Sequence, residues 1–366
     1  MPRKIRVGIL FGGRSAEHEV SLRSAKNIIA AIDSNKYEVV LIGIDKQGRW
    51  HLNEESRFLL PATQSELPEL PESSDNLALV PGTQGEQFVA LSGQQRFGSL
   101  DVIFPVLHGP FGEDGTVQGM LKLANIAFVG ASVLGSAVGM DKDVMKRLLR
   151  EAGIPIARFI AVSRYFSKEI GFDHARGQLG LPLFIKPANL GSSVGIHKVK
   201  NRQEFDRAVS DAFNYDNKIL IEECIAGREI ECSVLGNDNP IASVPGEILP
   251  RHEFYSYEAK YLDENGAVLE VPAKLPPEIS ERIRHLAIKT FSVLCCEGMA
   301  RVDFFLRNGS EIIVNEINTI PGFTRISMYP KLWEATGISY SELIDKLIEL
   351  AVERFQREKR LRTDRA

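Results

Sequence analysis

The residues of this chain best suited to chemistry lie on two short strands predicted around Asn308-Gly309. Runs of β-branched and aromatic residues flank this dipeptide within residues 300–318, which is the strongest short signal for a β-hairpin. A turn centred there predicts the cross-strand pairs Arg301 with Glu316, Asp303 with Val314, and Phe305 with Ile312. The hairpin should therefore place several polar side chains close to one another.

Side chains alternate between the two faces of a strand, and opposite residues share a face. The core face is expected to carry Val302, Phe304, Leu306, Ile313 and Ile317. The other face is expected to carry Arg301, Asp303, Phe305, Ile312, Val314, Glu316 and Asn318. An aspartate, a glutamate and an asparagine would thus gather on one patch bordered by apolar side chains.

Asp303, Glu316 and Asn318 are candidate metal ligands, because carboxylate and amide oxygens suit Mg²⁺ and no His or Cys is present to favour zinc. Proteins usually hold Mg²⁺ with one or two carboxylates plus substrate phosphates. The alternative is a simple cross-strand ion pair between Arg301 and Glu316. That pair would not explain the other two polar residues on the same face, but the residues alone leave both interpretations open.

A second candidate is the small-residue loop at positions 188–195, which follows a strand ending in Lys186-Pro187. Glycine and serine let backbone N–H groups approach phosphate oxygens, and Lys186 adds a positive charge. The loop is not a Walker A motif, because no Lys-Ser/Thr follows its second glycine. An ordinary hairpin turn is the alternative. Gly12-Gly13 resembles a dinucleotide-binding turn but lacks the full GxGxxG pattern.

The elements that must position these residues begin with a strand at 5–10, a helix with apolar positions from Val20 to Ile32, and a strand at 37–44. This order is typical of a doubly wound α/β domain. Residues 53–98 are rich in Glu, Gln, Ser and Pro and are expected to form a weakly ordered surface excursion. A strand at 102–106, a helix at 116–124 and a strand at 127–129 follow.

The pattern changes from Asp141, where an acidic start and a stop at Gly153 predict a helix. Strands are then predicted at 158–162, 183–186, 195–199 and 218–222, with one helix at 202–213. From Glu229 onward we expect long alternating strands and two closing helices. The last helix carries a core stripe of Leu343, Leu347, Ala351 and Phe355.

Composition narrows the class of protein. The chain has 366 residues, 44% of them hydrophobic and 25% charged, and a formal net charge of −4. This predicts a globular protein of about two to three domains, and it lacks the basic surplus of a general nucleic-acid or anionic-membrane binder. We expect a cytoplasmic protein, because Cys224, Cys232, Cys295 and Cys296 show no CxxC spacing and the N-terminal apolar run is too short for a signal peptide.

Seven segments in order resemble the D-alanine–D-alanine ligases of the ATP-grasp superfamily over essentially the whole chain. They are residues 11–21, 108–115, 140–142, 186–187 with 191–195, 257–261, 301–303, and 315–319 with 321–322. The resemblance implies α/β and α+β domains in an ATP-grasp architecture. Residues 1–139 would form a doubly wound N-terminal substrate domain, 140–228 a small central lobe, and 229–366 a C-terminal catalytic domain.

The reaction that the resemblance implies transfers phosphate from ATP to the carboxylate of one D-alanine. The amine of a second D-alanine then attacks the acyl phosphate, giving D-alanyl-D-alanine, ADP and phosphate for peptidoglycan precursor synthesis. Catalysis would consist mostly of positioning and charge neutralisation. Two Mg²⁺ ions, or Mn²⁺ in their place, would lie on Asp303, Glu316 and Asn318.

The resemblance also implies the ATP contacts. Lys142, Lys186 and Lys260 would bind the phosphates, and the loop of Ser192 and Ser193 would cover them. Adenine would meet the strap of Glu222, Glu223, Cys224 and Ile225, with the Glu223 side chain turned away. Glu229 would bind the ribose, Phe305 would pack near the base, and Asn315 would complete the set.

The substrate contacts follow in the same way. Glu17, linked to Ser192 and Tyr261, would hold the first ammonium group with support from His108. Arg301 and the Gly322 N–H would stabilise the oxyanion, and Ser327 with the Met328 N–H would bind the second carboxylate. From the residues alone, Glu17 could instead favour a helix N-terminus, His108 could be structural, and Ser327 could be a plain N-cap.

Three rival functions differ in their chemistry. A D-alanine–D-lactate ligase is the nearest, although in this family a tyrosine at the position of Tyr261 accompanies the dipeptide product. A ligase for another acid, or a nucleotide-binding regulator without turnover, would be expected to lose some of these residues. The resemblance further implies a homodimer, with D-alanine and ATP as the small-molecule partners, and closure of residues 257–261 over the reactants.

Overall fold

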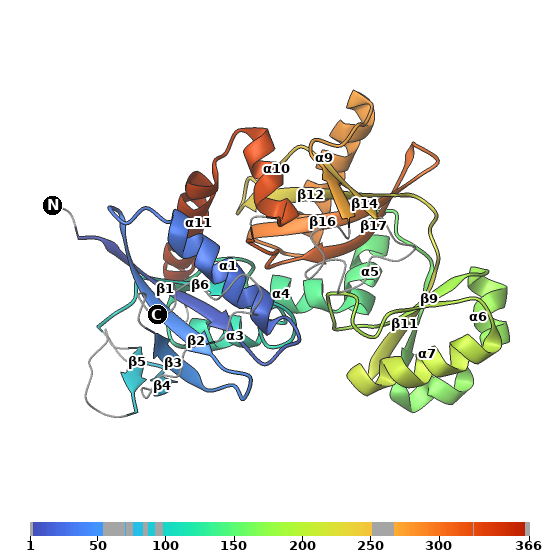
Figure 1. Ribbon diagram of the computed structural model, residues 1–366, viewed down its shortest axis with the longest axis horizontal. Helices are drawn as coiled ribbons and strands as arrows, with labels where there is room; N and C mark the ends of the chain where they lie inside the picture. The colour runs from blue at the N-terminus through green and yellow to red at the C-terminus, as the bar shows by residue number, and fades with distance from the viewer. Residues whose placement is uncertain are drawn as a thin grey trace.

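Three β-sheets follow one another along the chain, each with its own helices (Figure 1). The computed structural model describes residues 3–53, 70, 76–82, 87–91, 98–250, 267–324 and 326–362. The first and second sheets lie toward opposite ends of the long axis in Figure 1, with the third sheet above and between them. Three separate sheets can therefore each contribute residues to one site.

The first sheet has seven strands in the order β5-β4-β3-β2-β1-β6-β7. Its parallel centre consists of β1 (Ile5–Gly12), β2 (Tyr37–Ile44), β6 (Val102–Val106) and β7 (Ala127–Phe128). Helices α1 (His18–Ala31) and α3 (Thr116–Leu123) pack on this sheet, and α4 (Val133–Met140) follows in the sequence and contacts α3. The doubly wound opening is confirmed, whereas α4 was not predicted.

Part of the region expected to be a weakly ordered excursion belongs to this sheet, so that prediction is wrong for its described strands. Strands β3 (Trp50–Asn53), β4 (Asn76–Leu79) and β5 (Phe88–Ala90) extend the sheet in antiparallel fashion. Leu77, Phe88 and Ala90 are buried. These strands are only three or four residues long, and a few alternating apolar residues are easily masked by a polar, proline-rich composition.

The second sheet is small and antiparallel, with strand order β10-β9-β11-β8. Its strands are β8 (Phe159–Ser163), β9 (Leu183–Pro187), β10 (His197–Val199) and β11 (Lys218–Glu223), all at predicted positions. Helices α6 (Phe172–Leu179) and α7 (Arg202–Tyr215) pack on it and share its core. The α6 helix and the 3₁₀ turn Arg164–Glu169 were not predicted. Ahead of this sheet, α5 (Lys142–Glu151) forms as expected, with Asp141 as its N-cap.

The third sheet runs β15-β14-β12-β16-β17, with β13 paired to β12. Its strands are β12 (Arg228–Gly236), β13 (Ile241–Ala242), β14 (Gly246–Pro250), β15 (Ala267–Glu270), β16 (Gly298–Arg307) and β17 (Glu311–Asn318). The described part of this region holds α9 (Pro277–Val293), α10 (Met328–Thr336) and α11 (Tyr340–Lys359) instead of the two expected helices. The additional helix, α9, buries Ile279, Ile283, Ala287 and Phe291.

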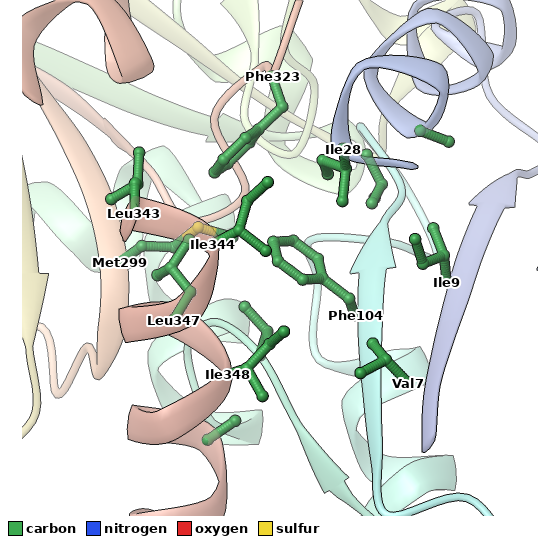
Figure 2. Close-up of a cluster of buried hydrophobic side chains, with 14 of the residues drawn as sticks. Val7, Ile9, Ile28, Phe104, Met299, Phe323, Leu343, Ile344, Leu347 and Ile348 are labelled. Carbon is green, nitrogen blue, oxygen red and sulfur yellow. The ribbon is translucent and has the colours of Figure 1, made fainter. Parts of the chain in front are cut away.

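The last helix packs against the first sheet, although it follows the third sheet in the sequence. Figure 2 shows Leu343, Ile344 and Leu347 of α11 beside strand residues such as Phe104 of β6. Of the predicted stripe, Leu343, Leu347 and Ala351 are buried and Phe355 packs at the edge. Arg354 of α11 is also buried and donates hydrogen bonds to the carbonyls of Phe128, at 2.7 Å, and Gly130.

No described helix, α11 included, is both long enough and apolar enough to pass through a membrane. Helix α11 instead packs along the first sheet and connects it to the third.

We expect Ile344→Ala to lower the free energy of unfolding in urea by about 2–5 kcal/mol, because it opens a cavity in a fully buried cluster. Lys346→Ala, on the same helix, is the matched control and should cost about 1 kcal/mol or less, since it removes only a partly exposed ion pair with Glu342. Equal effects of the two substitutions would show that α11 does not depend on this packing.

Candidate active site

A cleft draws its lining from all three sheets and from the start of α10. Its lining includes residues predicted separately from distant parts of the sequence: Glu17, His108, Gly191, Ser192, Arg301, Glu316, Asn318, Gly322, Ser327 and Met328. The lining also includes the buried Glu231 and the partly buried Glu113, two acids to which no role was assigned. The fold therefore brings together the predicted substrate-binding and catalytic residues that the structure describes, with Glu316 and Asn318 of the predicted metal ligands.

The predicted hairpin forms around Asn308 and Gly309, both of which have positive φ, but its predicted register is wrong. Arg301 lies opposite Asn318, and Asp303 lies opposite Glu316. The register shifts after Asp303, where Phe304 pairs with Val314 and leaves Asn315 as an extra residue in its strand. This is a β-bulge, which a count from the turn does not anticipate.

The bulge reverses the alternation in the outer half of the hairpin. On the inner half, Arg301, Asp303, Glu316 and Asn318 share a face, as predicted. On the outer half, Ile312 and Val314 lie in the core beside Phe304 and Leu306, while Ile313 joins Phe305 in a separate cluster. The predicted faces of Ile312, Ile313 and Val314 are therefore wrong, because one inserted residue exchanges the two faces.

Each hairpin carboxylate has a cationic partner. Arg301 donates to both oxygens of Asp303 at 2.7 Å, and Asn318 donates to Asp303 Oδ2 at 3.0 Å. Glu316 Oε2 lies 3.3 Å from Lys142 Nζ. Arg301 does not lie directly opposite Glu316, and its Nε contacts Asp303 at 2.7 Å and Glu231 at 2.9 Å.

The hairpin patch has the donor set of a Mg²⁺ site that shares its ion with a ligand. Asp303, Glu316 and Asn318 supply only oxygen ligands apart from the amide nitrogen. Among the described residues no three His, Cys, Asp or Glu side chains gather closely enough to enclose a metal. Two carboxylates and one amide would leave further coordination positions for water or phosphate.

The predicted phosphate loop lies against this patch. Lys142 at the start of α5 donates to the Leu190 carbonyl at 2.7 Å and also approaches Glu316. Ser192 and Ser193 have φ of 52° and 61°, a left-handed backbone that few non-glycine residues adopt. Strained backbone of this kind is concentrated at ligand sites, and an ordinary hairpin turn does not explain the lysine contacts.

The predicted adenine strap ends β11. Glu223 accepts hydrogen bonds from the Arg158 backbone N–H and side chain, each at 2.8 Å, so its side chain is directed to the residue that precedes β8. Ile225 packs with Phe305 in a small apolar cluster, together with Ala157 and Ile313. Glu229 lies opposite Phe305 on the neighbouring strand, and Cys224 is partly buried.

Glu17 connects the first sheet to the phosphate loop. It occupies the N-cap position of α1 but makes no side-chain capping bond there. Its carboxylate instead accepts a hydrogen bond from the Ser192 hydroxyl. The side chain is 7% exposed, so this bond is largely shielded from water. The contact favours a ligand-site role over helix stabilisation.

Ser327 occupies the N-cap position of α10, again without a side-chain capping bond. Its hydroxyl accepts a hydrogen bond from the Thr324 N–H at 3.0 Å and lies 2.7 Å from the Thr324 hydroxyl. A Cβ on Gly322 would lie only 2.8 Å from Ser327 Oγ. The absence of a side chain at Gly322 thus permits the close approach, and the plain N-cap interpretation is wrong.

His108 is buried and held by two contacts. Its Nδ1 lies 3.0 Å from the Ile320 carbonyl, and its Nε2 lies 3.4 Å from Ser24 Oγ. Burial lowers the pKa of His108 below its usual value, against the opposing effects of Glu17 and the Ile320 carbonyl. The ring is therefore neutral at neutral pH. It serves the packing of the cleft wall and also faces the cleft.

Glu113 joins two loops of the cleft and was missed. It accepts hydrogen bonds from the N–H groups of Gly109, at 2.7 Å, and Ile320, at 3.2 Å. Burial, and then the charge of Glu17, raise its pKa. Its position within the 108–115 motif could have identified it. Glu231 could have been found because it alternates with Glu229 on β12.

Two predicted residues, Lys260 and Tyr261, and the loop at 257–261 to which they belong, lie outside the described residues.

Comparison with known proteins shows the family to which the chain belongs. Residues 6–131 match the family model described as D-ala D-ala ligase N-terminus, and residues 148–349 match D-ala D-ala ligase C-terminus. The chain is 57% identical to a D-alanine–D-alanine ligase of Oceanobacillus iheyensis, over 99% of each chain. It is 54% identical to D-alanine–D-alanine ligase A of Escherichia coli strain K12, over 98% of this chain and 99% of the other. A solved D-alanine–D-alanine ligase from Coxiella burnetii superimposes with a TM-score of 0.86 at 41% identity, covering 98% of this chain and 96% of the other.

The lowered pKa of His108 makes a prediction about stability. The unfolded chain takes up a proton near pH 6.5, where the buried ring does not. The stability that depends on the neutral ring is therefore present above that pH and is lost as the pH falls. On going from about pH 7.5 to about pH 5.5, wild type should lose more stability in urea than His108→Gln does.

The exposed His174 provides the control, and His174→Gln should show the same pH dependence as wild type. If His108→Gln and wild type lost equal stability over this range, the neutral buried state of His108 would be contradicted.

Proposed function

Because this chain belongs to the D-alanine–D-alanine ligase family, we propose that the cleft described above is the site at which it joins two D-alanine molecules at the expense of ATP. The ATP-grasp fold and the ligase activity follow from relatives more than 50% identical over nearly the whole chain. The observation that carries the site is the placement of Asp303 and Glu316 side by side, with Lys142 against Glu316.

The reaction brings a carboxylate to a triphosphate, so its main obstacle is repulsion between negative charges. Cations that the fold holds in place would offset this repulsion. Lys142 and Lys186 come from α5 and β9, and Arg301 comes from β16. Each already contacts a carboxylate. The reactants would take over these cations, which need little rearrangement to bind phosphate.

Asp303, Glu316 and Asn318 would hold Mg²⁺, with two ions shared with the ATP phosphates. When bound, such ions neutralise charge that develops on phosphoryl oxygens. The support is the oxygen-only donor set on one strand face and the open positions that it leaves. Within this patch, Asn318 orients Asp303 through the hydrogen bond at 3.0 Å.

ATP would lie between the second and third sheets, that is between the proposed lobes 140–228 and 229–366. The base would pack on Ile225 and Phe305, with Glu222, Cys224 and the Glu223 backbone beside it and Glu229 at the ribose. Lys142 and Lys186 would bind phosphates under the loop of Ser192 and Ser193. Asn315, the extra residue of the bulge, lies next to the metal patch. Binding of phosphate by Lys260 remains a prediction.

The two D-alanine molecules would occupy the two ends of the lined cleft. Glu17 would bind the first ammonium group, with Ser192 and His108 as its neighbours. Ser327 and the Met328 N–H would bind the second carboxylate at the start of α10, where the helix dipole favours an anion. Arg301 and the Gly322 N–H would lie between them and stabilise the oxyanion. Tyr261, the homodimer and the cytoplasmic location remain predictions.

The direct test is a coupled phosphate-release assay with ATP, Mg²⁺ and one amino or hydroxy acid at a time. We expect turnover with D-alanine, with D-alanyl-D-alanine identified by mass spectrometry, and little with L-alanine. D-Serine and D-lactate are the informative comparisons for the second site. A preference for D-lactate over D-alanine at neutral pH would overturn the proposal in favour of a depsipeptide ligase.

The metal assignment makes its own prediction. Glu316→Gln should lower phosphate release by about 100-fold or more, since it removes a charge from the proposed metal patch. The matched control is Glu311→Gln on the same strand, where the side chain is 47% exposed and pairs with Arg307. It should keep wild-type turnover. Unchanged turnover in folded Glu316→Gln would refute the metal role.

A further inference from the structure

A second lysine of α5, Lys146, belongs to a buried cluster of charged residues with Glu222 and Lys186, behind the proposed ATP site. Its Nζ is 3.1 Å from Glu222 Oε1, while Lys186 Nζ is 2.5 Å from Glu222 Oε2. One carboxylate thus stands between two ammonium groups. Lys146 is fully buried, and Glu222 and Lys186 are 4% and 6% exposed. Such a cluster carries one more positive charge than negative charge, out of contact with water.

The environment of Lys146 offers the ammonium group little apart from this carboxylate. In the described part of the chain Lys146 Nζ has no hydrogen-bond partner beyond its ion pair with Glu222, and it lies 6.0 Å from the centroid of the Phe159 ring. Burial holds the pKa of Lys146 below its usual value, because the opposing charge of Glu222 offsets it only in part and the charge of Lys186 lowers it further. Burial alone would raise the pKa of Glu222, but the charges of Lys146 and Lys186 outweigh it and hold that pKa below its usual value.

The capped helix α5 fixes the position of Lys146. Lys142 and Lys146 are four residues apart on α5, so they project from one face of the helix. Lys142 reaches the phosphate loop and Glu316, while Lys146 reaches Glu222 at the start of the adenine strap. The helix begins at Asp141, which caps it through the N–H groups of Asp143 and Val144 at 3.1 Å. Lys146 itself is buried and is not among the residues that line the cleft.

The role of Lys146 becomes clear when the nucleotide binds, an argument that rests on the proposed function. Lys186 would then have to share its ammonium group between Glu222 and phosphate, which weakens its pairing with Glu222. A buried carboxylate that loses its partner costs several kcal/mol. We propose that Lys146 is a positioning residue, the permanent counter-ion of Glu222, which releases Lys186 to the phosphates of ATP without leaving a buried carboxylate unpaired.

This role predicts how the protein behaves without Lys146. In the absence of nucleotide, Glu222 and Lys186 would still form a balanced pair, so Lys146→Met should fold. On nucleotide binding Lys186 would be shared with phosphate, and no second cation would remain to balance Glu222. The loss should therefore appear in nucleotide affinity and not in folding.

The test is the dissociation constant for ADP with Mg²⁺, measured by calorimetry, together with the KM values for ATP and D-alanine. We expect Lys146→Met to weaken ADP binding by about 10- to 100-fold and to raise the KM for ATP. The KM for D-alanine should stay close to the wild-type value. Arg147→Met is the matched control, because it removes one positive charge from α5 where the side chain is 61% exposed, and it should bind ADP as wild type does.

A double variant asks whether Lys146 acts through the charge of Glu222. Lys146→Met should weaken ADP binding no further when Glu222 is already Gln. The proposal would be overturned by undiminished ADP affinity in Lys146→Met, by an equal loss in both backgrounds, or by failure of Lys146→Met to fold. ADP binding needs no ligation, so these outcomes can be distinguished from failure of the proposed reaction.

Discussion

The cleft depends on one electrostatic constraint: a charge removed from water must keep a partner of opposite charge. Its carboxylates meet this constraint in pairs drawn from different elements, namely Lys142 with Glu316, Lys186 with Glu222, and Arg301 with Asp303. The partners must lie within about 3 Å of each other, so the elements that carry them have little freedom. The same pairs leave the cations prepared for phosphate and the carboxylates prepared for metal ions.

The apolar cores supply the rigidity that these pairs require. The cluster in Figure 2 holds the first sheet, and with it Glu17 and His108, against α11. A second cluster packs Met145 and Leu149 of α5 against the strands that carry Asp303 and Glu316. The second sheet has its own core and reaches the others through polar contacts, including the bond from Ser192 to Glu17. Core packing thus sets the distances on which the charge pairing depends.

Much of this arrangement could be predicted from sequence, since the strand, turn and helix signals of β1, β2, β6, α7 and the hairpin are local. The shared face of Asp303 and Glu316 was predicted despite a wrong register, because an error of two residues preserves the alternation. The bulge at Asn315 was not predictable from period two alone, and it reversed Ile312 to Val314. Lys146 was missed because it acts through a contact with Glu222, far away in the sequence, whereas Glu113 and Glu231 lie in patterns that could have identified them. Short strands such as β5 have too few residues to show a recognisable alternation of apolar and polar side chains.

The central claim is that the ion pairs of the cleft hold the places that the reactants take. A crystal structure with ADP, Mg²⁺ and a phosphinate mimic of the acyl phosphate tests it most directly. The account predicts metal ions on both Asp303 and Glu316, with Lys142 moved from Glu316 to a phosphate oxygen. A nucleotide bound with the Lys142–Glu316 contact intact, or with metal ions away from both carboxylates, would contradict it.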